Sequence, residues 1–128
     1  MTYHFSKTVA MEFLAAVDKV TAELKAQGFG ILTQIDVQKT LKAKLDVEFR
    51  PYLILGACNP AFAYKALQAE DKIGTMLPCN VIVQQRTDGQ VEISAVNPVA
   101  SMAAIENPGL ASIAEDVRSR LQQVVDAI

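Results

Sequence analysis

The period of the apolar positions changes several times along the chain, and each period predicts a different element. Residues 3–9 form an extended segment with Tyr3 and Phe5 on one face, which predicts a strand. From Met11 onward the spacing is helical. The positions that share the apolar helix face are Met11, Leu14, Val17, Val20, Thr21 and Leu24. Gly28 predicts the end of this helix, because glycine readily adopts the left-handed conformation found at helix C-termini.

The next segments are short and mostly apolar. Residues 29–35 are predicted to form a strand, and Asp36 is expected to cap a brief helix that follows it. Pro51 has no N–H group for a strand ladder, so it marks the beginning of the next strand, at residues 52–55. Through this region the chain therefore alternates strand, short helix and strand.

A hairpin is predicted in the second half of the chain. Residues 79–86 are apolar at their centre, and Asp88-Gly89 is one of the strongest short turn signals between two strands. Residues 91–96 alternate between apolar and polar side chains and would form the partner strand. The two segments should therefore pair antiparallel.

Three Asn-Pro pairs mark the beginnings of helices: Asn59-Pro60, Asn97-Pro98 and Asn107-Pro108. Asparagine at the N-cap accepts a hydrogen bond from an unpaired backbone N–H, and proline at the first helical position has no N–H to leave unpaired. The last pair precedes a long amphipathic segment that runs to the C-terminus. Its apolar stripe consists of Leu110, Ile113, Ala114, Val117, Leu121, Val124 and Val125.

This order of elements predicts an α+β fold of two layers, in which a mostly antiparallel sheet packs against helices. With 128 residues and no linker or repeat, residues 1–128 should form a single domain. Strand order stays open. Strands that are apolar on both faces need cover on both sides, so if the helices pack on one face we expect a second subunit on the other, in a homodimer. Cover by the short helices and loops is the alternative.

Composition restricts the classes of partner. The chain is 51% hydrophobic and 20% charged, which is typical of a folded globular protein. A formal charge of -2 and a pI near 5.3 indicate that neither nucleic acid nor an anionic membrane is a partner. No apolar run approaches the roughly 20 residues of a membrane span, and we recognise no secretion signal, so we expect a cytoplasmic protein with reduced cysteines.

The only two cysteines lie where apolar runs meet turn signals. They belong to the segments Gly56-Ala57-Cys58-Asn59-Pro60 and Leu77-Pro78-Cys79-Asn80. Cys58 precedes the helix that Asn59 is predicted to cap, and the positive end of a helix dipole would lower the pKa of its thiol. If the two strands are antiparallel neighbours, Cys58 and Cys79 could form a dithiol site for redox chemistry or for a soft metal such as copper(I).

A purely structural role for the two cysteines is the favoured alternative. A free cysteine often packs in a core as a small apolar side chain, and neither CxxC nor a placed histidine supports a reactive pair. Zinc is disfavoured because the only histidine, His4, is distant in sequence. No catalytic motif is present, so we do not expect an enzyme, and a cysteine nucleophile would lack a recognisable base.

A binding function of a different class is also consistent with the sequence. A small apolar or aromatic molecule could lie between the sheet and the helices, against the aromatic residues Phe29, Tyr52, Phe62 and Tyr64. Phe62 and Tyr64 are two positions apart on a predicted helix, so they cannot both face inward. The sequence thus predicts a binding or accessory protein, with either a cysteine site or an apolar ligand site.

The two cysteine segments, together with Gly28-Phe29-Gly30 and Ile35-Asp36-Val37, resemble the domain-of-unknown-function family 302 in order and spacing. The likeness covers nearly the whole chain. It implies a small bacterial or archaeal α+β protein with a curved sheet packed against helices, associated as a dimer, and it implies no established activity. In this family the position of Asn59 and Pro60 implies an architectural role at the corner between strand and helix.

Overall fold

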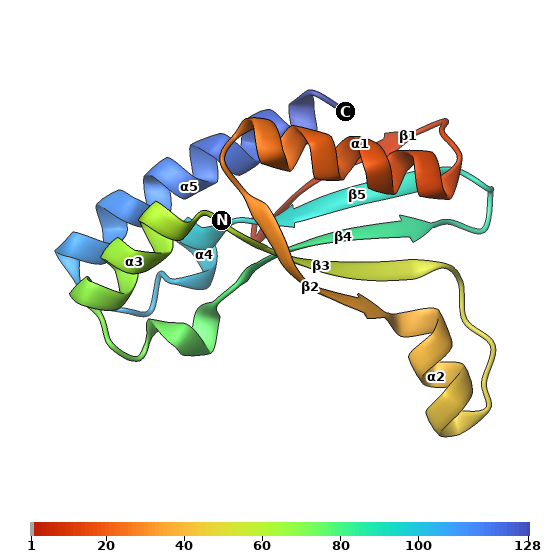
Figure 1. Ribbon diagram of the computed structural model, residues 1–128, viewed down its shortest axis with the longest axis horizontal. Helices are drawn as coiled ribbons and strands as arrows, with labels where there is room; N and C mark the ends of the chain where they lie inside the picture. The colour runs from red at the N-terminus through yellow and green to blue at the C-terminus, as the bar shows by residue number, and fades with distance from the viewer. Residues whose placement is uncertain (1) are drawn as a thin grey trace.

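A computed structural model describes residues 2–128, and Figure 1 shows its elements. The strands are β1 (His4–Val9), β2 (Gly30–Asp36), β3 (Tyr52–Cys58), β4 (Cys79–Gln85) and β5 (Val91–Val96). The helices are α1 (Phe13–Ala26), α2 (Val37–Leu45), α3 (Pro60–Ala69), α4 (Pro98–Ser101) and α5 (Pro108–Asp126), with a 3-10 turn, η1 (Ile73–Met76), before β4. These elements confirm the predicted order.

The five strands form one antiparallel sheet in the order β1-β5-β4-β3-β2. Strands β3, β4 and β5 are neighbours in sequence and in space, whereas β1 and β2 lie at opposite edges and are joined by α1. The predicted hairpin between β4 and β5 is confirmed. Its turn contains Gly89 with a φ of 83°, and Arg86 N donates to Gln90 O at 2.7 Å. The α+β prediction is therefore confirmed.

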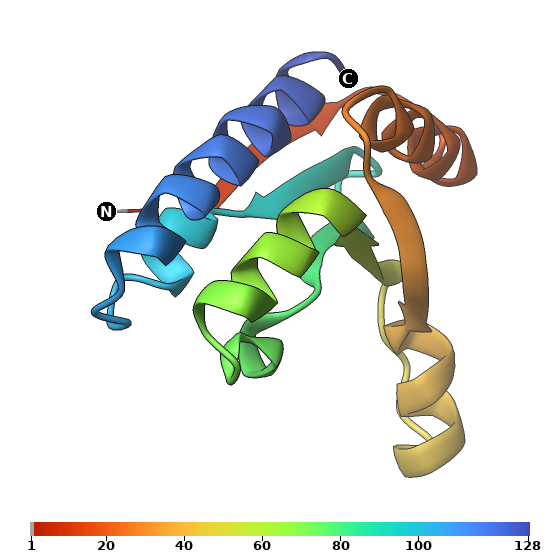
Figure 2. The same ribbon diagram turned by 60° about the vertical axis from the view of Figure 1, so that its left-hand side comes forward.

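Helices α1 and α5 pack on one face of the sheet, whereas α3 and α4 pack against α5 beyond the ends of the strands, and α2 projects from the end of β2 away from them (Figures 1 and 2). The main core lies between the sheet and helices α1 and α5, and a second, smaller apolar cluster lies between α3, α5 and the segment that follows α4. The buried sheet residues of the main core are Leu53, Leu55, Ala57, Cys79, Val81, Val83, Val91, Ile93 and Ala95. The opposite side of the sheet, here called the open face, carries the alternate residues of the same strands.

The Asn-Pro prediction is confirmed at all three helices. Asn59, Asn97 and Asn107 each occupy the N-cap position, and each side chain accepts a hydrogen bond from a backbone N–H two or three residues further on. Proline follows at the first position in each case. Asp36 likewise caps α2, because its Oδ1 accepts from Lys39 N at 2.9 Å. Local sequence therefore sets where four of the five helices begin.

Two details differ from the predictions at the N-terminal half. The first helix begins at Phe13 with Glu12 as its N-cap, and Leu14, predicted on its buried face, is 63% exposed. The predictions for Leu14 and for Thr21, which is also exposed, are wrong in phase, because the buried stripe of α1 is centred on Ala16, Val20 and Leu24 with Phe13 and Val17 beside it. Strand β2 is an edge strand with a bulge, which leaves Leu32 67% exposed.

Among residues 2–128, no helix is long and apolar enough to cross a lipid bilayer.

Candidate functional site

The turn that ends α1 places the first side chain of the candidate site. Gly28 has a φ of 85°, its N–H donates to Lys25 O at 3.0 Å, and Phe29 N donates to Leu24 O at 2.9 Å. This pattern of hydrogen bonds is the Schellman motif, which needs glycine at the left-handed position. The turn sends Phe29, only 3% exposed, inward beside the end of β3.

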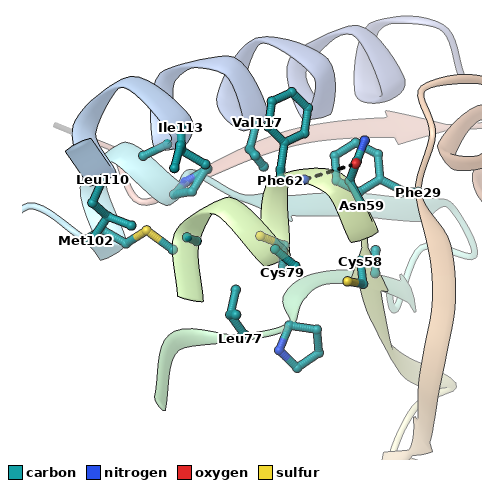
Figure 3. A pocket seen from close by; sticks show the side chains of 16 residues that line it. Phe29, Cys58, Asn59, Phe62, Leu77, Cys79, Met102, Leu110, Ile113 and Val117 are labelled. Carbon is teal, nitrogen blue, oxygen red and sulfur yellow. Dashed lines mark hydrogen bonds between the residues drawn. The ribbon is translucent and has the colours of Figure 1, made fainter. Parts of the chain in front are cut away.

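The corner between β3 and α3 supplies the next side chains. Asn59 follows β3 directly, and its Oδ1 accepts from Phe62 N at 3.4 Å. A Cβ atom at Gly28 would lie 2.9 Å from Asn59 Nδ2, so the corner packs closely against the turn of α1. The capped helix turns Phe62, Ala63 and Ala66 toward the interior (Figure 3). The architectural role implied for Asn59 agrees with this geometry.

Between these corners and α5 lies an apolar cavity, here called the main cavity (Figure 3). Its volume is about 40 Å³, counted as the space that the centre of a water molecule can reach. The residues that line it are Phe29, Ala57, Cys58, Asn59, Phe62, Ala63, Ala66, Leu77, Pro78, Cys79, Pro98, Met102, Leu110, Ile113, Ala114 and Val117. Apart from the two thiols, Asn59 is the single polar side chain of this lining, and its oxygen is already occupied by the cap.

Both cysteines line the main cavity at adjoining ends of antiparallel neighbours, as predicted, but the two thiols are not close to each other, so the expected dithiol pair is not formed. Cys58 ends β3 and Cys79 begins β4, where Cys79 pairs across the ladder with Ala57. Because successive side chains of a strand alternate, Cys58 starts from the other side of the sheet than Cys79. Both thiols are free, and no group of three potential metal ligands occurs within residues 2–128.

The electrostatics of the two thiols differ from the sequence prediction. Burial raises the pKa of Cys58 above its ordinary value. Burial, and to a lesser extent the neighbouring charge of Cys58, raises the pKa of Cys79 from 9.0 to about 11. The predicted lowering of the Cys58 pKa is therefore wrong, because loss of water around the sulfur raises this pKa. Both side chains are neutral thiols at pH 7.

The remaining predicted residues are divided between the cavity and the surface. Phe29 and Phe62 form part of the cavity wall as predicted. Tyr64 lies on the outer side of α3 and is 65% exposed, so of the two residues that were not expected to face inward together, Phe62 lines the cavity and Tyr64 does not. Tyr52 begins β3 at the far end of the strand, with the Arg50 guanidinium carbon 5.6 Å from its ring centre, and it does not line the cavity. Tyr52 is six residues from Cys58 along the same strand, which at about 3.3 Å per residue places it roughly 20 Å from the cavity.

His4 lies away from the cysteines. Its Nδ1 is 2.7 Å from Ser6 Oγ, which in turn is 2.7 Å from Ser94 Oγ, on the open face of β1 and β5. This hydrogen-bonded chain occupies the opposite side of the sheet from Cys79. His4 and the two cysteines are therefore not brought together at one metal site.

The chain is similar to a known protein family and to a solved structure. The family model described as "Domain of unknown function DUF302" matches residues 5–128. The chain belongs to the DUF302 family. The same fold occurs in the crystal structure of an uncharacterized conserved DUF302 protein from Bacillus stearothermophilus, with a TM-score of 0.92 and 30% sequence identity. The match covers 99% of this chain and 98% of that one. No curated protein matches.

The part of the DUF302 site that sequence reasoning missed comes from α4 and α5. Met102, Leu110 and Ile113 close the cavity opposite Phe29. The apolar stripe of α5 is visible in the sequence, but a stripe shows which face is buried and not what it meets. Only the packing of α5 beside α3 shows that its first turns line a cavity.

Proposed function

We propose that this DUF302 chain binds a small apolar molecule, or the apolar end of a larger one, in the main cavity. The observation that carries the proposal is a cavity lined almost entirely by apolar side chains and enclosed by α3, α5 and the ends of β3 and β4. Small-molecule sites are typically concave and apolar with a few polar groups. Asn59 and the two thiols supply such groups here.

Water is a poor occupant of the main cavity. A water molecule needs roughly 10–15 Å³ of such space, so the volume of about 40 Å³ is sufficient, but a buried water also needs two to four polar partners. Among residues 2–128 no buried side-chain nitrogen or oxygen lacks a hydrogen bond. The lining therefore offers water few partners, and apolar atoms gain more from occupying the space.

The raised thiol pKa values favour an apolar ligand over the dithiol alternative. Metal binding and disulfide exchange both use the thiolate form of cysteine. Cys58 and Cys79 are held as neutral thiols by burial. A buried neutral thiol behaves as a small apolar group, which suits a cavity wall. Copper(I) binding or redox cycling would have to overcome this cost of ionisation.

The test of the proposal is Ala63→Leu, which adds three carbon atoms at a half-buried position of the cavity wall. We expect 1-butanol to bind the wild type and to bind this variant about tenfold or more weakly, because the new side chain occupies the ligand's space. Binding is measured by titration, from the shifts of alanine methyl signals in NMR spectra.

The matched control is Ala61→Leu, an exposed position of the same helix that does not line the cavity. Wild-type affinity in this variant shows that a larger side chain on α3 is not itself harmful. Equal binding of 1-butanol to the wild type and to Ala63→Leu, or no binding to either, would contradict the proposal.

We further infer that the protein forms a homodimer through the open face. Helices α1 and α5 cover only one side of the sheet, which is the condition under which the sequence predicts a second subunit. Ile35, Ile54 and Ile82 lie together on the open face, in register across β2, β3 and β4. Polar residues of β1 and β5, including Ser6 and Thr8, flank them. The three isoleucines run from the edge strand β2 to the central strand β4 and are bordered by polar residues on the β5 side, and an apolar area bordered by polar residues is typical of an interface between identical subunits.

Light scattering at micromolar concentration tests this inference. The wild type is expected at twice the chain mass of 13.9 kDa, and Ile82→Lys at 13.9 kDa, because a lysine on the central strand would bury an unpaired charge. Leu67→Lys, on the exposed side of α3, serves as the control and should stay dimeric. A wild-type mass of 13.9 kDa would remove the inference.

A further inference from the structure

A second apolar hollow adjoins the main cavity. This α4 hollow has a volume of about 180 Å³, counted in the same way, and its lining consists only of apolar residues from α4, the following loop and α5, among them Val99, Ile105 and Ala111. Three residues line both spaces: Met102, Leu110 and Ala114. The two spaces are thus separated by a wall one side chain thick.

Met102 is the movable part of that wall. It directly follows α4, its N–H donates to Pro98 O at 3.0 Å, and its side chain is buried. Leu110 is fixed on the first turn of α5, behind the Asn107 cap, and Ala114 has no side-chain torsion that moves a heavy atom. An unbranched thioether has three rotatable bonds and adapts to irregular spaces. Rotation of Met102 would therefore join the main cavity to the α4 hollow without a change in the backbone.

We propose that the ligand is an unbranched alkyl chain that passes through the main cavity and past Met102 into the α4 hollow. This inference rests on the proposed apolar-ligand function and names the class of ligand. The main cavity is small and the adjoining α4 hollow is larger, so a thin flexible chain can extend from one into the other, whereas a compact ring system would have to enlarge the main cavity. The α4 hollow offers no polar side chain, so the polar end of the ligand stays at the side of Asn59 and Cys58.

Chain length is the variable that tests the proposal. The probes are 1-butanol, 1-hexanol, 1-octanol and the compact 1-adamantanol, titrated into the full chain and followed by NMR. For the wild type we expect affinity to rise by about fourfold for each methylene that enters apolar surroundings, up to 1-octanol. We expect 1-adamantanol to bind more weakly than 1-octanol. Tighter binding of 1-adamantanol would overturn the proposal.

The variant that separates the two spaces is Ala111→Phe. Ala111 is exposed, lines the α4 hollow and does not line the main cavity, so phenylalanine there fills the hollow alone. In this variant we expect the affinity for 1-butanol to be unchanged. The affinity should stop increasing with chain length before 1-octanol is reached. The control is Ser112→Phe, at an exposed neighbouring position that lines neither space. Its affinities for the four alcohols should match those of the wild type.

The outcomes distinguish the alkyl-chain proposal from the proposal that the main cavity binds an apolar ligand. If Ala111→Phe shows the same rise with chain length as the wild type, the alkyl-chain proposal fails, while loss of 1-butanol binding in Ala63→Leu still supports the main cavity as the site. If 1-butanol does not bind the wild type, or binds Ala63→Leu equally well, both proposals fail.

Discussion

Replacing Gly56 by alanine is expected to lower the free energy of unfolding by about 2–3 kcal/mol. Gly56 is buried in the middle of β3, opposite Thr33 of β2 and Asn80 of β4. An added Cβ would overlap Thr33 Oγ1 and would lie 2.8 Å from Pro78 Cγ. Because both neighbours are held by the sheet and by the segment that enters β4, the added atom must displace them. Urea unfolding of the wild type and the variant measures the change.

A double mutant identifies the source of the loss at Gly56. In the Gly56→Ala background, Thr33→Ala removes the overlapping hydroxyl and is expected to recover about 1 kcal/mol. Gly30→Ala is the matched control in β2, because a Cβ there meets no atom within 4 Å, and its effect should stay within about 0.5 kcal/mol. A Gly56→Ala variant as stable as Gly30→Ala would show that the close packing of β2, β3 and Pro78 is not rigid.

Alkaline pH is expected to destabilise the protein through Cys79. The thiol pKa is about 11 in the folded chain and near 9.0 when exposed to water, so between these values the folded state binds more protons than the unfolded state. Stability therefore falls as pH rises through this window. Two pKa units at about 1.4 kcal/mol each correspond to about 3 kcal/mol, present below pH 9 and lost by pH 11.

Comparison of cysteine variants isolates the contribution of Cys79. Urea unfolding at about pH 8 and at about pH 10.5 should show a smaller loss of stability for Cys79→Ala than for the wild type. Cys58→Ala should keep most of the wild-type loss, because Cys58 is less buried and acts on Cys79 only as a lesser influence. Equal pH dependence in the wild type and in Cys79→Ala would contradict the burial of this thiol.

Local signals predicted the parts of the fold that local chemistry decides. The Asn-Pro pairs, Asp36 and Asp88-Gly89 act on backbone groups within a few residues, so the beginnings of α2, α3, α4 and α5 and the β4–β5 turn could be read from the sequence. The pairing of β1 with β5 could not, because its partners are separated by most of the chain.

The sequence predicted where the candidate site lies, but not all of the residues that line it or the properties of its thiols. Cys58 and Cys79 could be placed as neighbours at strand ends, but their pKa values depend on what buries them, and helices from elsewhere in the chain supply that cover. Phe29 and Phe62 were predicted to line a pocket and do so, whereas Tyr52 was assigned to it although it lies at the opposite end of β3 from Cys58. The contribution of Met102 had no sequence signal, because a methionine in an apolar segment is ordinary core material.

The projecting helix α2 should unfold with a smaller free energy than the rest of the domain. None of its residues is buried, and its ends are held by the Asp36 cap and by exposed ion pairs of Lys42 with Asp46 and Glu48. Such contacts contribute little free energy, so α2 can unfold locally while the sheet and both cavities stay intact. Its amide hydrogens should exchange with solvent through this local opening. Those of β4, which is paired on both sides, should exchange only when the whole domain unfolds.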